Sequence, residues 1–224
     1  MVETATLDYA DMTLDELRVA LAPEIAANAI FDGWSDTALV TAADAVGANA
    51  DVARLAFPGG AMDMIDAWIV NIDLAMIDAF PAERIASLKI RERIRELIAY
   101  RLEAVTGLEE SVRRATAIMA MPQNARRALK TGWRSADEMW RLAGDTATDY
   151  NHYTKRAILA SIYAATLAVF VDDQSEGKQV SYAFLDRRID GVMKFEKAKA
   201  QLLGGEREYF SISRFLGRLR YPTR

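Results

Sequence analysis

The residues with the clearest potential for chemistry are Asp149 and His152, three positions apart in the stretch GDTATDYNHYTKR, residues 144–156. On a helix this spacing places a carboxylate and an imidazole next to each other, as in the ligand pairs of di-iron helical bundles. Such a metal centre needs two pairs of this kind, and His152 is the only histidine in the chain. We therefore predict no metal site, and we interpret Asp149 as the N-cap of a helix that begins at Tyr150.

Other enzyme motifs do not occur in the sequence either. It has no Gly-x-Ser-x-Gly elbow, no phosphate-binding loop and no dinucleotide glycine fingerprint. Zero cysteines exclude a thiol nucleophile, thiolate zinc sites and a disulfide framework. We predict a non-enzyme with no catalytic residue and no cofactor. The stretch around His152 is then either a surface for another protein or a place where Tyr150 and Tyr153 pack partly against a bundle.

Length and composition bound the fold. A chain of 224 residues that is 51% hydrophobic can bury one sizeable core. Five prolines and twelve glycines are few for this length, and runs of Ala, Leu, Arg and Glu favour helices. The first residues are acidic and lack the pattern of a signal peptide or a mitochondrial presequence, from which we predict a bacterial, cytoplasmic protein.

Hydrophobic periodicity predicts an all-α fold without strands. Thr13 and Glu16 form a capping box ahead of the first helix, and Pro81 and Pro122 end later ones. Residues 157–171 carry no charge, and fifteen residues at ~1.5 Å each span about 22 Å, short of a ~30 Å hydrocarbon layer. We interpret this stretch as the buried centre of a bundle or one wall of a lipid cavity. The predicted helices cover residues 14–31, 37–46, 51–57, 61–80, 88–105, 111–121, 124–143, 150–171, 179–203 and 206–221.

Residues 33–57 resemble the helix-turn-helix of TetR-type regulators, with Gly33-Trp34, Thr37, Gly47 and Phe57 at the family's positions. The resemblance implies a TetR-like bundle of nine or ten helices whose larger C-terminal part has a ligand pocket and a dimer face. Residues 1–80 contain fourteen acidic and two basic residues, a net charge of −12, and residues 81–224 carry a net +8. Since Arg54 is the only cation of the reading helix, we predict no binding to nucleic acid.

Residues 113–173 are similar to the Coq-nine family of ubiquinone biosynthesis accessory proteins, and a weaker similarity covers most of residues 33–200. The matching positions are Ile118, Met119, Pro122, Asn124, Met139-Trp140, Ala143-Gly144-Asp145, Thr148-Asp149, Asn151, Tyr153-Thr154 and Arg156. The resemblance implies a homodimer with a TetR-type fold that binds an isoprenoid lipid or ubiquinone intermediate and presents it to the demethoxyubiquinone hydroxylase or an equivalent ring hydroxylase. A TetR-type ligand-responsive transcription regulator is the competing interpretation.

The same resemblance implies which residues dock the partner. The family's patch corresponds here to Asp149, Asn151, His152, Tyr153 and Arg156. Eukaryotic members commonly have tryptophan where this chain has His152, so any contact made by that position is more polar here. Tyrosine and arginine are frequent anchors of protein interfaces, which suits this role.

Lipid contact is expected from the apolar helix that follows. Leu159, Tyr163, Leu167 and Phe170 share one face by steps of four and three residues, and Trp133 and Trp140 come from the preceding predicted helix. The alternative interpretation of these side chains is ordinary core packing, because a stripe at helical spacing packs a core first of all.

The last residues form a basic amphipathic pattern. Ile212, Phe215, Leu216 and Leu219 make an apolar stripe, with Arg214 and Arg218 one turn apart. A helix of this kind contacts anionic membranes, although docking on the bundle or the dimer mate fits the same pattern. We predict three regions: 1–60 with the helix-turn-helix, 61–203 as the lipid-binding and dimerisation bundle, and 204–224 as a tail that places the protein at the inner membrane.

Overall fold

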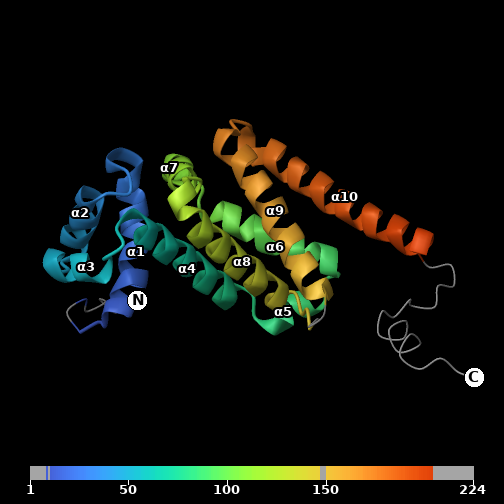
Figure 1. Ribbon diagram of the computed structural model, residues 1–224, viewed down its shortest axis with the longest axis horizontal. Coiled ribbons are helices and arrows are strands. Elements are labelled where there is room, and N and C mark those ends of the chain that lie inside the picture. Colours follow the sequence, from blue (N-terminus) through green and yellow to red (C-terminus); the bar gives the residue numbers. More distant parts are fainter. Residues whose placement is uncertain (1–8, 10, 147–149, 204–224) are drawn as a thin grey trace, which may run out of the picture. The chain divides into compact units, whose positions relative to one another are not determined.

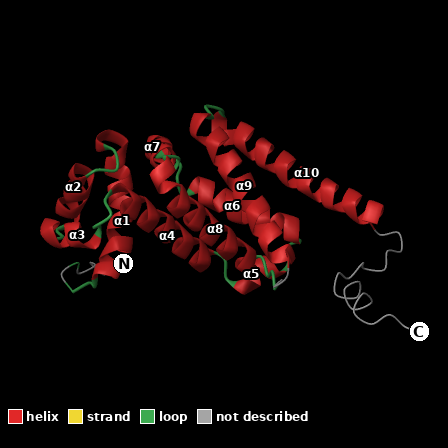
Figure 2. Ribbon diagram, in the orientation of Figure 1, coloured by secondary structure: helices red, strands yellow, loops and turns green. Residues whose placement is uncertain are grey.

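The computed structural model describes residues 9, 11–146 and 150–203, and over these residues the chain forms ten α-helices and two short 3₁₀ turns and no strand (Figures 1 and 2). The all-α class predicted from periodicity is confirmed. The first five helices are α1 (Leu14–Asp32), α2 (Asp36–Val46), α3 (Ala50–Ala56), α4 (Ala61–Ala79) and α5 (Ala82–Ala86). The others are α6 (Ile90–Glu103), α7 (Glu109–Met119), α8 (Ala125–Leu142), α9 (Tyr150–Asp172) and α10 (Gln179–Leu203).

Local capping explains the first boundaries. The Thr13 hydroxyl accepts a hydrogen bond from the Glu16 N–H at 3.3 Å, and the Glu16 carboxylate accepts one from the Thr13 N–H at 2.9 Å. This is the predicted capping box. The one helix that the periodicity analysis missed is α5, because its five residues follow Pro81 and are too few to show a helical repeat.

The N-terminal helices α1, α2 and α3 pack together around Leu17, Leu21, Ile25 and Leu39, each no more than 2% exposed. Figure 1 shows this group at one end of α4. Trp34, just before α2, attaches it to the bundle: its indole N–H donates to the Ser111 carbonyl of α7 at 3.0 Å. The predicted boundary after residue 60 therefore falls between helices that share buried contacts.

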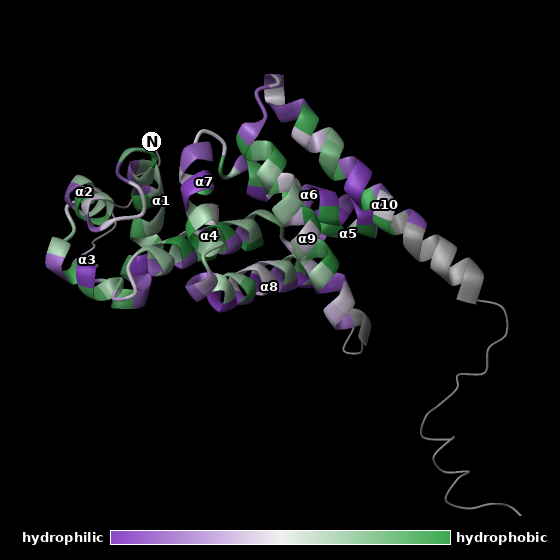
Figure 3. Ribbon diagram, turned by 45° about the horizontal axis from the view of Figure 1, so that its top comes forward, coloured by the Kyte–Doolittle hydropathy of each residue, from purple (hydrophilic) through white to green (hydrophobic). Residues whose placement is uncertain are grey.

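The bundle is built from α4, α6, α7, α8 and α9. Figure 1 shows α8 and α9 side by side, and α4 contacts α6, α7 and α8. In Figure 3, much of α4 and α9 is green, and purple hydrophilic residues are more frequent on α7 and α8. The buried side chains of the bundle helices, among them Met76, Leu97, Met139 and Leu159, form its apolar interior.

Helix α9 is only partly buried. Leu159, Ile162, Thr166 and Phe170 form its buried stripe, while Ala157, Ser161, Ala164 and Ala168 are exposed on another face. In the described part of the chain, one stretch, His152–Asp172, is long and apolar enough to cross a membrane by length and composition, a test that core helices of soluble proteins also pass. Only 28% of its most apolar window is buried, so the interpretation of residues 157–171 as the buried centre of the bundle is wrong. The alternative interpretation, one wall of a lipid cavity, stays a prediction.

The chain divides into two compact units, Met1–Leu185 and Asp186–Arg224. Helix α10 begins in the first unit, and its residues from Asp186 to Leu203 are the described part of the second. The predicted division into 1–60, 61–203 and 204–224 stays a prediction.

Candidate functional site

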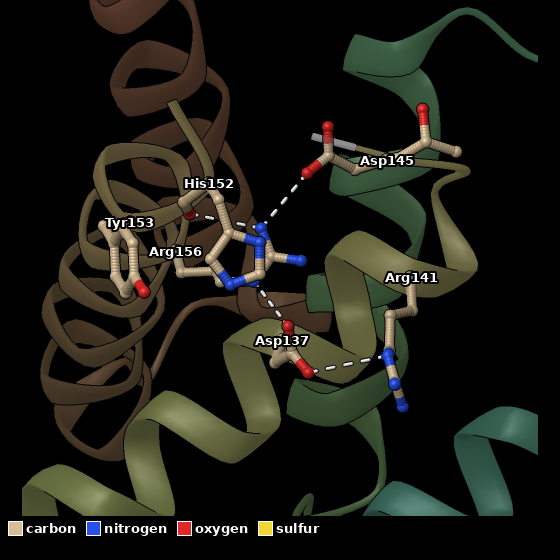
Figure 4. Close-up of a pocket in the computed structure, with 7 residues that line it drawn as sticks. Asp137, Arg141, Asp145, His152, Tyr153 and Arg156 are labelled. Atoms are coloured by element: carbon tan, nitrogen blue, oxygen red, sulfur yellow. Dashed lines mark hydrogen bonds and ion pairs between the residues drawn. The ribbon is translucent and has the colours of Figure 1, made fainter. Parts of the chain in front are cut away.

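Where α8 ends and α9 begins, polar side chains line a pocket of about 350 Å³ (Figure 4). Four of its seven residues are charged and only Tyr153 brings a large apolar surface, so the pocket suits polar contacts and not a polyprenyl tail. Its residues are Asp137, Arg141, Asp145, Thr146, His152, Tyr153 and Arg156.

Arg156 holds this pocket together. Arg156 is 2% exposed. Its Nε donates to Asp137 of α8, and its Nη1 donates to Asp145 at 3.1 Å. The same Nη1 donates to the His152 carbonyl at 3.1 Å. Lys155 adds a second cation, with Nζ 2.5 Å from Asp145. Two carboxylates share this buried guanidinium, and none of its buried nitrogens lacks an acceptor among the described residues. The network therefore fixes the loop and the first turns of α9 against α8.

Backbone contacts of the loop bring Asp145 to Arg156. The Asp145 N–H donates to the Trp140 carbonyl at 2.9 Å, and Gly144 adopts φ 86°, a left-handed conformation that favours glycine. Arg93 of α6 clamps the end of α8 from the other side. Its Nη1 donates to the Ala143 carbonyl at 2.9 Å, and its Nε and Nη2 donate to the carbonyls of Leu88 and Ala86.

An aromatic cluster lies beside the pocket. The Trp133 ring centroid is 5.9 Å from that of Tyr153 and 6.5 Å from that of His152, and His152 meets Tyr153 edge-on at 5.1 Å. Tyr153 is 62% exposed. We call Trp133, His152 and Tyr153 the aromatic surface. Because the Arg156 network fixes the helices beneath it, little conformational entropy is left to lose when a partner covers it.

The predicted docking residues have different surroundings. Tyr153 is exposed and His152 is partly exposed in the aromatic surface, whereas Arg156 lies beneath it as a buried support. Asp149 and the side chain of Asn151 lie outside the described residues. Their joint docking role stays a prediction. Among the described residues, no group of three or more His, Cys, Asp or Glu side chains is placed to hold a metal ion.

The predicted lipid-contact residues divide into four side chains on α9 and two tryptophans on α8. Leu159 and Phe170 are buried at 1% and 0% exposure, and Tyr163 and Leu167 are partly exposed on α9. The two tryptophans belong instead to the pocket region: Trp133 is part of the aromatic surface, and the Trp140 indole donates to the Lys155 carbonyl at 2.9 Å. Lipid contact by these residues stays a prediction. The predicted membrane-contact residues Ile212, Arg214, Phe215, Leu216, Arg218 and Leu219 lie outside the described residues.

Sequence reasoning missed the residues that support the site. Asp137 and Asp145 complete the Arg156 network, and Arg93 fixes the loop from a helix about fifty residues earlier. Asp145 could have been found, since it closes the Ala143-Gly144-Asp145 motif. Nothing in the local sequence marks Arg93, because its acceptors are backbone carbonyls.

The fold identifies the structural class of this chain. A solved TetR transcriptional regulator from Nitrosomonas europaea ATCC 19718 is similar to this chain with a TM-score of 0.63. The match covers 80% of this chain and 98% of the regulator at 22% sequence identity. The TetR-like fold predicted from residues 33–57 is confirmed, and at this identity the likeness concerns the fold alone.

Sequence comparisons indicate which protein family the chain resembles. The COQ9 family model matches residues 125–196, which include all seven pocket residues. The rat and human mitochondrial ubiquinone biosynthesis proteins COQ9 are 28% and 27% identical over 177 residues, 76% of this chain and 56% and 55% of theirs. The Schizosaccharomyces pombe protein is 28% identical over 158 residues, 70% of this chain and 62% of its own. The resemblance to the Coq-nine family is confirmed, and the chain spans about half the length of the curated mammalian relatives.

The comparisons correct one prediction. We expected a bacterial, cytoplasmic location, but the curated relatives from rat, human, fission yeast and fruit fly are all mitochondrial proteins. The expectation rested on the residues at the start of the sequence. Those residues precede the region that the COQ9 family model matches, and the relatives are longer than this chain, so the start does not decide the location.

Proposed function

We propose that this chain is a non-enzymatic accessory protein of ubiquinone biosynthesis, which binds an isoprenoid quinone precursor and presents it to a ring hydroxylase at a membrane. The observation that carries the proposal is the position of the aromatic surface and its pocket inside the segment that matches the COQ9 family model. In this role the bundle holds the lipid and the aromatic surface receives the hydroxylase.

The aromatic surface has the properties of a docking anchor. Tyr153 is exposed, packs on Trp133 and His152, and stands over a network that fixes its helix. Tyrosine and tryptophan bury large areas at low entropic cost, which makes them frequent hot spots. The pocket next to them offers both charge signs to a polar rim on the partner.

The exposed side of α9 supports the homodimer that forms part of this proposal. Ala157, Ser161, Ala164 and Ala168 follow one another by steps of four, three and four residues and are exposed. Small side chains let two helices approach closely, and a helix whose most apolar window is only 28% buried gains by association with a second copy.

Two observations speak against the competing proposal of a DNA-binding regulator. Arg54 of α3 is occupied by acids of its own domain: Nε and Nη2 donate to Asp36 at 2.9 and 3.1 Å, and Nη1 donates to Asp51 at 3.0 Å. In addition, the net charge of −12 over residues 1–80 repels a polyanion. A nanomolar DNA shift that weakens with salt would favour the regulator.

The experiment replaces Tyr153 by Ala in cells that depend on this protein. We expect lower ubiquinone, accumulation of a hydroxylation substrate and an unchanged fold, because truncating a central anchor costs about 2 kcal/mol of binding. Phe31→Ala is the matched control, since Phe31 is an aromatic residue that is 81% exposed on α1. Normal quinone levels in a folded Tyr153→Ala strain would refute the docking role.

Membrane contact by residues 204–224 is tested separately. Flotation of the full chain with liposomes is compared with that of a chain ending at Leu203, using anionic and neutral lipids. Five arginines against two glutamates in 206–224 predict that deletion abolishes charge-dependent flotation. Unchanged flotation would place the contact elsewhere.

A further inference from the structure

A second cluster of charges lies in the interior of the bundle, apart from the pocket. Arg101 of α6 is 1% exposed, and side chains from three other helices surround it. Its Nη1 donates to Asp73 of α4, its Nη2 donates to Ser135 of α8 at 3.2 Å, and its guanidinium carbon lies 4.9 Å from the ring centroid of Tyr163 of α9. Helices α4, α6, α8 and α9 therefore meet at one guanidinium.

The hydrogen bonds of Arg101 are incomplete. Its Nε is buried and has no acceptor in the described part of the chain. Burial lowers the pKa of the Arg101 guanidinium, but the neighbouring Tyr163 and Asp73 outweigh this effect and keep the group charged. A buried N–H without an acceptor loses its hydrogen bonds to water and gains none in return, so an acceptor from outside the chain would stabilise this site.

The charges around Arg101 indicate what kind of acceptor fits. Arg134 lies 3.6 Å from Asp73 and donates to Asp66 at 3.0 Å. Burial raises the pKa of the Asp66 carboxyl, but hydrogen bonds from Arg134 and Thr131 outweigh it and keep Asp66 ionised. Two guanidiniums, Arg101 and Arg134, thus face two carboxylates, Asp66 and Asp73. Because the cluster is neutral, a neutral oxygen completes it, whereas an anion would add an unpaired buried charge.

We propose that Arg101 Nε–H binds a neutral ring oxygen of a quinone or phenol head group, with Tyr163 as the aromatic wall beside the ring. This inference rests on the proposed function and names the part of the lipid that the bundle recognises. Tyr163 is partly exposed, so on this inference the ring enters from the side of α9. Leu159, one turn earlier on the same helix, is apolar and buried.

The test compares three ligands that share a six-membered ring and a ten-carbon tail: 2-decyl-1,4-benzoquinone, decylbenzene and 4-decylbenzoate. The full chain contains no cysteine, so the quinone forms no thiol adduct. We expect the quinone to bind at least about tenfold more tightly than decylbenzene, as for one hydrogen bond to a charged donor, and the benzoate to bind more weakly than the quinone.

Arg101→Lys keeps a cation for Asp73 but removes the Nε donor. In this variant we expect the preference for the quinone to disappear while decylbenzene binds as before. The matched control is Arg127→Lys, which changes an arginine that pairs with Asp63 on the same helices α8 and α4 and is 45% exposed. As a second measurement, the ¹H–¹⁵N signal of Arg101 Nε in the unmodified chain should shift with the quinone and not with decylbenzene.

The outcomes separate the two proposals. If none of the three ligands binds, the proposed lipid-binding function is refuted, and this inference with it. If decylbenzene binds but the quinone has no advantage, or keeps its advantage in folded Arg101→Lys, the head-group site alone is refuted, and buried water then satisfies Nε. Equal or tighter binding of the benzoate refutes a neutral acceptor. If Arg101→Lys does not fold, the Nε signal decides.

Discussion

Arg101 and Arg156 are equally buried, at 1% and 2% exposure, yet their surroundings differ. Arg156 donates from Nε and Nη1 to two carboxylates and a carbonyl, and these bonds join α8, the loop and α9. Arg101 has Asp73, Ser135 and Tyr163 as neighbours, but its buried Nε has no acceptor among the described residues. The two side chains are equally buried, but only Arg101 leaves a buried nitrogen without an acceptor among the described residues.

The difference separates two uses of a buried cation. A guanidinium that leaves no buried nitrogen without an acceptor joins parts of the chain, because every bond it makes holds one part to another. An unsaturated one retains a free-energy cost that a ligand oxygen can remove on binding. The location of a charge in the interior therefore says less about its role than the count of its acceptors.

The largest effect is expected from Arg156→Met. It leaves Asp137 and Asp145 without their shared cation, and breaking a buried pair in this way costs about 3–5 kcal/mol of unfolding free energy. Urea unfolding followed by circular dichroism measures it. Arg141→Ala, an exposed pocket arginine at 65% side-chain exposure, is the control and should cost less than about 1 kcal/mol. A loss below about 1 kcal/mol for Arg156→Met would contradict the structural role.

Arg101→Met should cost less, about 2–3 kcal/mol. Asp73 keeps the Ser135 hydroxyl at 3.2 Å and Arg134 at 3.6 Å, and the variant also removes the unsatisfied Nε. The same urea experiment gives the value. If Arg101→Met were more destabilising than Arg156→Met, the proposed distinction between the two arginines would be wrong.

A saturated buried anion extends the comparison to the opposite charge. Asp173, between α9 and α10, accepts hydrogen bonds from the N–H groups of Ser175 and Ser181 at 2.9 and 2.8 Å and from both hydroxyls. Burial alone raises the pKa of the Asp173 carboxyl, but these hydrogen bonds outweigh it and hold that pKa well below its usual range.

Because the folded-state pKa is depressed, the stabilisation by Asp173 is present above the unfolded-state pKa of about 3.9 and is lost as the pH falls below it. Asp173→Asn should therefore cost about 1–2 kcal/mol at pH 7 and progressively less below pH 4. Unfolding measured from pH 7 to pH 2 checks this. A difference between the two proteins that stayed constant with pH would exclude the carboxylate as its source.

The smallest effect is expected at the surface. Arg54 makes three short hydrogen bonds to Asp36 and Asp51, but the side chains are 45%, 64% and 89% exposed. Exposed pairs contribute about 0–1 kcal/mol, so Arg54→Ala should hardly change the urea midpoint. It should also leave nucleic-acid binding absent in a filter-binding assay. A loss above about 2 kcal/mol would show that number of bonds, and not burial, dominates stability here.

Most of the fold was predictable because local rules agree with it. Capping at Thr13, proline at Pro81 and Pro122 and the spacing of apolar residues placed nine of the described helices near their observed bounds. Helix α5 was not predicted, because a helix of five residues is too short to show a hydrophobic period. The exposure of α9 was not predicted either, because composition does not show how many faces of a helix have neighbours.

The site was predictable only in part. His152, Tyr153 and Arg156 stood out by residue type and family resemblance, and the structure brings them to one pocket. Asp137 and Arg93 join them through contacts between distant segments, which no local pattern encodes. The incomplete satisfaction of Arg101 follows from four helices at once and could not be predicted from any of them alone.

The attachment of Trp34 to α7 has a consequence for how this fold can move. A ligand-responsive regulator works by letting occupancy of the bundle change the spacing of its reading heads, so the head has to pivot on the bundle at low cost. Here the indole bonds Ser111, packs 5.3 Å from the Trp68 ring of α4, and the Ser111 hydroxyl donates to the Ala26 carbonyl of α1. Pivoting would break buried hydrogen bonds on both sides of that joint. We infer that the N-terminal helices act as a rigid end-piece of the bundle, so that a signal from the proposed lipid would leave the molecule by another route.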